Sequence, residues 1–152
     1  MPETPDSLIH YRGPMATDMH EALARLKRRW SNKGIELLPP ATPAHIHAVF
    51  KRLGAVATPD VIALYTTLGG MSVMDEDYLQ IWSLEDISKQ DPSDGGVVFA
   101  DYLISCWEYH LVPSAGPCSA VRGSTLQHHT GPTLEAFLIS LEAEKDFLER
   151  YR

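Results

Sequence analysis

The stretch Tyr65-Thr66-Thr67-Leu68-Gly69-Gly70-Met71 separates a helical half of the chain from a half rich in strand patterns. It ends a helical pattern with two glycines and then continues with an apolar residue. A phosphate-binding glycine loop precedes a helix, because the helix N-terminus then meets the anion. Here the glycines follow a helix instead. We therefore predict a structural turn, in which Gly69 stops the helix with a positive φ and Gly70 completes a sharp exit toward a sheet.

Three helices are predicted before and at this stretch. The first covers residues 18–30, where Asp18 and Glu21 have the spacing of a capping box. The next two, around residues 42–54 and 58–69, share one design, with Thr as the N-cap, Pro as the first helical residue and Gly as the stop.

The segments after the glycines read mainly as strands. Residues 78–82, 97–102, 103–111 and 118–121 are rich in aromatic and β-branched residues, and residues 133–151 show a final helical pattern. Helices followed by strands and a last helix favour an α+β fold, with a largely antiparallel sheet on which the N-terminal and C-terminal helices pack. We assign residues 1–16 to a proline-containing arm and residues 17–152 to a single domain.

Composition and charge narrow the function classes. Of 152 residues, 44% are hydrophobic and 22% are charged, as in ordinary globular proteins. No apolar run is long enough for a membrane span, and the N-terminus has no secretory pattern. Cys106 and Cys118 lack metal-binding spacing, so we expect reduced thiols in a cytoplasmic protein. A formal net charge of −7 argues against direct nucleic-acid binding and fits a basic protein partner.

An acidic cluster just before a tyrosine is the first candidate binding site. Asp75, Glu76 and Asp77 precede Tyr78 in a segment expected to be a loop. A solvated loop explains the cluster without any function. Alternatively, the carboxylates attract a basic partner and the aromatic ring anchors it.

The predicted strands contain a candidate group of acid/base residues. Glu108 and His110 alternate on one face of a predicted strand, and Asp101 lies just upstream. A carboxylate beside an imidazole can act in general acid/base catalysis, although the polar outer face of a sheet explains these residues more simply. No nucleophile motif accompanies them, so we assign no catalytic residues.

The histidine pairs do not form a convincing metal site. His45 and His47 are two residues apart on a predicted helix and do not share a face. His128 and His129 need ligands from elsewhere in the chain. We therefore expect neither a metal ion nor another cofactor.

An ordered series of motifs across residues 35–150 resembles the SUKH superfamily, which includes fungal cell-wall assembly regulators of the SMI-KNR type and many bacterial proteins. The series comprises Thr58-Pro59-Asp60, Leu68-Gly69-Gly70, YLQIWSLEDI at 78–87, VFADYLI at 98–104 and TLEAFL at 133–138. Two positions depart from the family pattern, since Thr58 stands where Leu is usual and Leu68 stands where Asn is usual.

The resemblance implies an α+β fold without established enzyme activity. It also implies that bacterial members are often immunity proteins, which bind and block a toxin, commonly a nuclease or a deaminase. Two function classes remain, and the oligomeric state is open in both. The first is a non-enzymatic module that binds a basic toxin domain through exposed acidic and aromatic side chains, namely Asp75, Glu76, Asp77, Tyr78, Asp101 and Trp107. The second is a small hydrolase or metal-dependent enzyme that uses Asp101, Glu108 and His110, or the pair His128 and His129.

Overall fold

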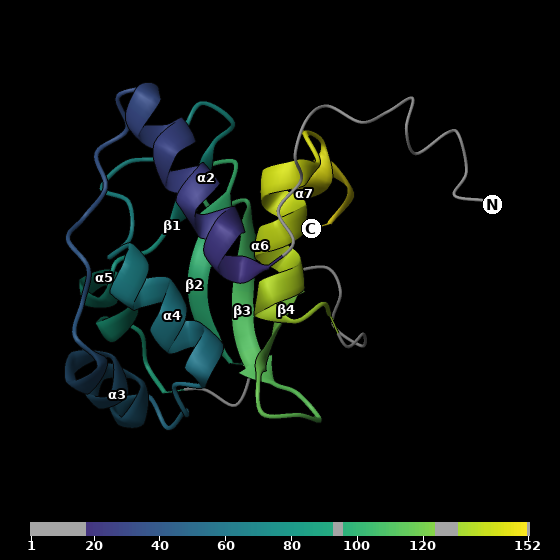
Figure 1. The fold of residues 1–152 in the computed structure, drawn as a ribbon. Coiled ribbons are helices and arrows are strands. Elements are labelled where there is room, and N and C mark those ends of the chain that lie inside the picture. The colour runs from purple at the N-terminus through teal and green to yellow at the C-terminus, as the bar shows by residue number, and fades with distance from the viewer. Residues whose placement is uncertain (1–17, 93–95, 124–130, 152) are drawn as a thin grey trace.

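The computed structural model describes residues 18–92, 96–123 and 131–151. Within these ranges, three helices come first (Figure 1): α2 (Met19–Asn32), α3 (Pro43–Arg52) and α4 (Pro59–Thr67). They are followed by β1 (Leu79–Ile81), α5 (Leu84–Ser88), β2 (Val97–Tyr102), β3 (Trp107–Pro113), β4 (Ser119–Gly123), α6 (Leu134–Ala143) and α7 (Phe147–Arg150). The four strands form one antiparallel sheet in the order β1-β2-β3-β4. The predicted α+β fold is confirmed, whereas the predicted arm lies outside the described residues.

The helices begin largely where capping chemistry predicts. The side chains of Asp18, Thr42 and Ser83 each accept a hydrogen bond from the backbone N–H three residues later. Thr58 precedes α4 but makes no such capping bond. Its hydroxyl oxygen lies instead 2.7 Å from Ser119 Oγ on β4, so Thr58 connects a helix start to the sheet.

The exit from α4 differs from the prediction. The residue after the helix, Leu68, already has an extended backbone with φ −148°. Among the described residues the positive-φ glycines include Gly70, with φ 112°, and do not include Gly69. The prediction of a left-handed Gly69 is therefore wrong. Because the chain leaves the helix in an extended conformation, the left-handed residue comes later, at Gly70.

Segment 69–71 lies between two other backbone segments. On one side, Gly69 N donates to Leu38 O at 3.0 Å, and Gly70 O accepts from Leu38 N at 2.9 Å. On the other side, Met71 N donates to Ile81 O of β1 at 2.8 Å. The stretch that divides the sequence therefore joins the helical half to the sheet.

Close backbone approach explains why both positions are glycine. A Cβ atom on Gly69 would overlap the carbonyl oxygen of Pro39. A Cβ atom on Gly70 would lie 2.7 Å from Cα of Ser83. No other residue lets the backbones come this near without displacement.

Two other predicted elements are interrupted. The strand expected over 103–111 begins only at Trp107, because Leu103, Ile104 and Ser105 have φ values of 58°, 55° and 65° and form a left-handed turn. The helix expected over 133–151 divides into α6 and α7, with an extended residue, Glu144, after α6.

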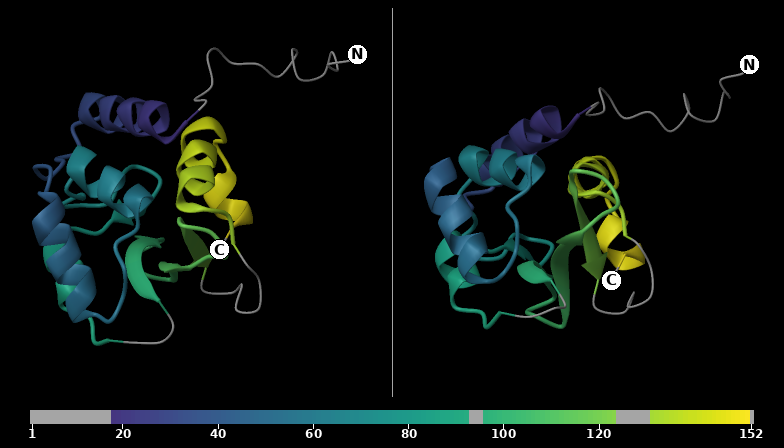
Figure 2. Two further views of the ribbon diagram at one scale, coloured as in Figure 1. Left: turned by 60° about the horizontal axis from the view of Figure 1, so that its bottom comes forward. Right: turned by 90° about the horizontal axis from the view of Figure 1, so that it is seen from below.

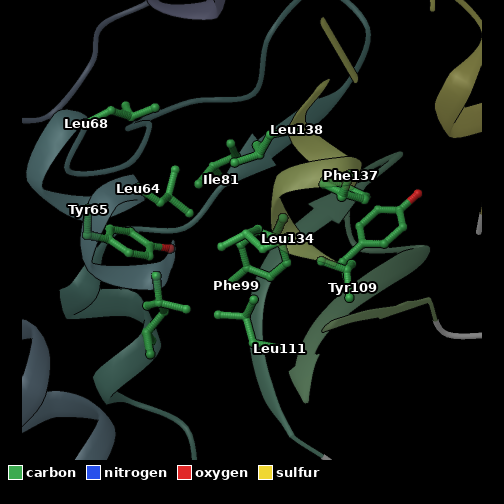
Figure 3. Close-up of a cluster of buried hydrophobic side chains, with 14 of the residues drawn as sticks. Leu64, Tyr65, Leu68, Ile81, Phe99, Tyr109, Leu111, Leu134, Phe137 and Leu138 are labelled. Atoms are coloured by element: carbon green, nitrogen blue, oxygen red, sulfur yellow. The ribbon is translucent and has the colours of Figure 1, made fainter. Parts of the chain in front are cut away.

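The hydrophobic core lies between one face of the sheet and the helices. Figure 2 shows α2 beside α6 on the same side of the sheet. Figure 3 shows Phe137 of α6 close to Phe99 of β2 and Tyr109 of β3, while Tyr65 of α4 approaches from the other side of the cluster. The ring centroid of Phe137 is 6.0 Å from that of Phe99 and 5.3 Å from that of Tyr109. This packing joins the sheet to the helices through one core.

Candidate functional site

Asp75 shapes the predicted acidic segment from within. We call residues 75–78 the acidic loop. They lie between Gly69 and Gly70, which we call the glycine exit, and strand β1. The Oδ2 atom of Asp75 accepts a hydrogen bond from Trp30 Nε1 at 2.9 Å. Its Oδ1 atom accepts from the backbone N–H groups of Asp77, at 2.8 Å, and Leu79, at 3.0 Å. Asp75 is therefore a structural residue that fixes the loop, and its carboxylate is already engaged inside the chain.

The other three residues of the acidic loop are exposed. Glu76 lies 3.2 Å from Lys33 Nζ, in an ion pair whose two side chains are each 55% exposed and which therefore adds little stability. Tyr78 is 50% exposed and has a φ of 67°. The loop thus presents Glu76, Asp77 and Tyr78 to solvent on a backbone fixed by Asp75.

Asp77 lies in an excess of negative charge. Partial burial is the main reason that its pKa is raised, and the carboxylates of Asp75 and Glu76 raise it further. Arg29 and Lys145 act in the opposite direction without cancelling this shift. The ionised form of Asp77 is therefore disfavoured in the isolated domain, and a cation brought close to it relieves the repulsion.

A second loop is attached to the acidic loop. The hairpin tip, residues 103–106, connects β2 to β3. Leu103 N donates to Tyr78 O at 2.9 Å, and Cys106 N donates to Leu103 O at 3.1 Å. Ser105 N donates to Asp101 Oδ1 at 3.0 Å. These bonds hold the tip in its left-handed conformation. Side chains such as Leu, Ile and Ser do not signal this conformation, so sequence reasoning assigned the tip to a strand.

Asp101 lies at the base of the hairpin tip and is 6% exposed. Its Oδ2 atom accepts a hydrogen bond from Trp82 Nε1 at 2.6 Å, while Oδ1 is engaged by Ser105. In the sheet it stands opposite Glu108 of β3. Asp101 therefore holds the tip in place, and its two oxygens are occupied by other groups of the chain.

His110 lies on the same outer face of the sheet as Glu108, since the alternate residues of β3 are buried in the core. It stands opposite Val98 on β2 and Arg122 on β4. Burial lowers the pKa of His110, and the charge of Arg122 lowers it further, against a smaller opposing effect of a backbone hydrogen bond at Arg122. The imidazole is consequently biased toward its neutral form.

The remaining predicted contact, Trp107, follows the hairpin tip directly. It is half-buried, packs against the core and stands opposite Tyr102. The six predicted contact residues thus meet around the tip: the acidic loop binds it through Tyr78, Asp101 binds it through Ser105, and Trp107 continues it. Only Glu76, Asp77 and Tyr78 of these six present largely exposed side chains.

A groove of about 1000 Å³ runs beside the acidic loop. Leu103 of the hairpin tip, the C-terminal half of α2 and the α6–α7 segment complete its walls. A smaller hollow of about 470 Å³ lies on the outer face of the sheet, next to Trp82 and Asp101. The acidic loop and hairpin tip therefore form the rim of the larger depression.

Metal ligands do not gather in the part of the chain that the structure describes. Within 18–92, 96–123 and 131–151, no three His, Cys, Asp or Glu residues are placed to hold a metal ion. His128 and His129 lie outside these ranges. None of the helices in the described segments is long and apolar enough to span a bilayer.

The fold and this surface define a small α+β domain with a groove that is lined by the acidic loop, by Leu103 and by side chains of both signs from α2 and the α6–α7 segment, among them Arg29 and Lys145. The chain matches no protein-family model and no curated protein.

Proposed function

We propose that this chain is a non-enzymatic, cytoplasmic protein-binding module, an immunity protein that neutralises a basic toxin domain of the nuclease or deaminase type by direct binding. The SUKH-like order of motifs motivates this class. The observation that carries the proposal is the acidic loop, because Asp75 fixes it internally while Glu76, Asp77 and Tyr78 point outward.

The charges at the loop support a basic partner. Burial is the larger cause of the raised pKa of Asp77, and the carboxylates of Asp75 and Glu76 add to it, so a partner Lys or Arg is attracted to this cluster and offsets its internal repulsion. The formal net charge of −7 adds a long-range attraction that speeds encounter. Tyr78, half-exposed beside these carboxylates, offers the kind of aromatic anchor that is enriched at interface hot spots.

The enzymatic alternative has weaker support in the geometry. It uses Asp101, Glu108 and His110 as acid/base groups, and Asp101 stands opposite Glu108 in the sheet. Both oxygens of Asp101 instead accept hydrogen bonds, from Trp82 and from Ser105. Protonation of Asp101 would weaken the hydrogen bonds that it accepts from Trp82 and Ser105, so a structural role accounts for this carboxylate better.

The test is the association rate with the protein encoded by the neighbouring gene, because immunity genes sit beside their toxin genes. The variant Glu76→Gln/Asp77→Asn removes two exposed charges and leaves the structural Asp75 intact. We expect slower association and a weaker dependence on ionic strength, since less attraction remains to be screened. The control, Glu85→Gln/Asp91→Asn, removes two exposed acids on and after α5 and changes the net charge equally.

Three results would contradict the proposal in different ways. Failure of the parent protein to bind the neighbour removes the immunity function. Equal slowing by both double variants shows that net charge acts and the acidic loop does not. Steady turnover of a phosphodiester or nucleoside substrate by the isolated chain, lost in His110→Gln, supports the enzymatic alternative instead.

A further inference from the structure

The hairpin tip combines an exposed apolar side chain with an unfavourable backbone. Ile104 is 68% exposed and has a φ of 55°. A left-handed backbone is disfavoured for every residue with a Cβ and most strongly for β-branched residues such as Ile. A side chain that contributes so little to the core yet occupies such a position is not explained by the stability of this domain.

The tip is nevertheless rigidly held. Its backbone is hydrogen bonded to Tyr78 O through Leu103 and to the buried carboxylate of Asp101 through Ser105. The conformation that exposes Ile104 is thus fixed before any partner arrives. A preorganised apolar side chain loses little conformational freedom on binding, which favours affinity.

The surroundings of Ile104 define the chemistry of a partner. The neighbouring residue Leu103 is bonded to Tyr78, which places the tip beside the exposed acids Glu76 and Asp77. An apolar side chain on a tip that is hydrogen bonded to the acidic loop matches an apolar recess with Lys or Arg nearby. Charge complementarity therefore favours a basic protein over a second copy of this acidic chain, whose own tip would bring like charges together.

We infer that Ile104 is the apolar anchor of the binding surface and inserts into a recess, rimmed by basic residues, on the basic protein partner. This inference rests on the proposed function and adds a division of roles within it. The acidic loop governs how fast the partner arrives, and Ile104 governs how long it stays.

The test compares Ile104→Asn with Val56→Asn in the full chain, using the protein encoded by the neighbouring gene as the probe. Asn accepts a left-handed backbone, so the variant keeps the tip conformation and removes only the apolar side chain. Val56 is 78% exposed on the connection between α3 and α4 and serves as the matched control. We expect Ile104→Asn to speed dissociation on the order of 30-fold, with an unchanged salt dependence of association, and Val56→Asn to behave as the parent.

The outcomes of these measurements decide between the anchor, the proposed function and a second copy as the occupant. Parent-like dissociation of Ile104→Asn from a neighbour that binds the parent overturns the anchor and leaves the function standing. Faster dissociation of Ile104→Asn, together with no effect of Glu76→Gln/Asp77→Asn, keeps Ile104 as a contact but overturns the division of roles, because the acidic loop then does not govern association. A parent protein that does not bind the neighbour overturns both. Concentration-dependent self-association that Ile104→Asn abolishes makes a second copy the occupant and overturns the inference. A clear loss of thermal stability in Ile104→Asn also overturns the inference, because it shows that Ile104 stabilises the fold.

Discussion

The glycine exit at Gly69 and Gly70 and the hairpin tip at 103–106 are two tight turns built from opposite kinds of residue. At the exit, backbone atoms of other segments occupy the space that a Cβ atom needs at either glycine. At the tip, three consecutive residues with full side chains hold positive φ values, and the middle one, Ile104, is largely exposed.

The two turns differ in what explains their residues: backbone packing explains the glycines, and it does not explain the isoleucine. Glycine at the exit is the residue that the surrounding backbone requires, so the residue type agrees with the tertiary structure there, although neighbouring segments decide which glycine is left-handed. Isoleucine at the tip is a poor choice for its own backbone conformation. Where a natural sequence breaks a local rule in this way, a functional role is the usual reason.

The largest effect should come from the exit. Gly69→Ala places a Cβ atom onto the carbonyl oxygen of Pro39. The atoms in conflict belong to the backbone, so they cannot move aside as the end of a flexible side chain can. We expect a loss of about 3 kcal/mol in the free energy of unfolding, measured by urea titration. Gly116→Ala is the control, because a Cβ atom there meets nothing within 4 Å and the backbone is not left-handed. Equal stability of the two variants would show that the approach of Gly69 to Pro39 is not tight in solution.

A smaller effect of opposite sign should come from the tip. Ile104→Asn keeps the left-handed turn and replaces a β-branched residue with one that tolerates it. We expect the free energy of unfolding to rise by about 0.5–1 kcal/mol. The comparison of the two turns fails if the variant is less stable than the parent in the same urea titration.

The smallest effect should come from Asp77. Its raised pKa means that the folded state holds the proton more tightly than the unfolded state, so the ionised form weakens the fold. This contribution favours folding below the ordinary Asp pKa and is lost as the pH rises through the raised value. Asp77→Asn should therefore be more stable than the parent at pH 7 by a few tenths of a kcal/mol, because the group is largely exposed.

The same measurement at low pH checks the sign of that effect. Near pH 3 both Asp77 and its Asn replacement are mostly neutral, so the difference between parent and variant should shrink. A variant that is less stable than the parent at pH 7, or a difference that grows on acidification, contradicts the excess of negative charge at the acidic loop.

Much of the fold could be predicted from local patterns, and the candidate site could be predicted only in part. The α+β order and the N-caps Asp18 and Thr42 follow from short-range chemistry. The acidic loop was visible as a cluster of charges. The internal organisation of the loop could not be predicted, because Asp75 differs from its neighbours through a hydrogen bond from Trp30, which is 45 residues away in the chain.

The sequence by itself determined where α2, α3, α4 and α6 begin, that a sheet follows the two glycines and that the chain carries an excess of acid. These features depend on residues a few positions apart, so a linear pattern contains them. Only the tertiary structure decided that Gly70 rather than Gly69 has a positive φ, and that Ile104 stands in a left-handed turn. The reason is physical: the backbones of Leu38 and Ile81 direct the glycine exit, and Tyr78 O with the Asp101 carboxylate holds the hairpin tip. Such long-range contacts outweigh local preference, and no linear pattern contains them.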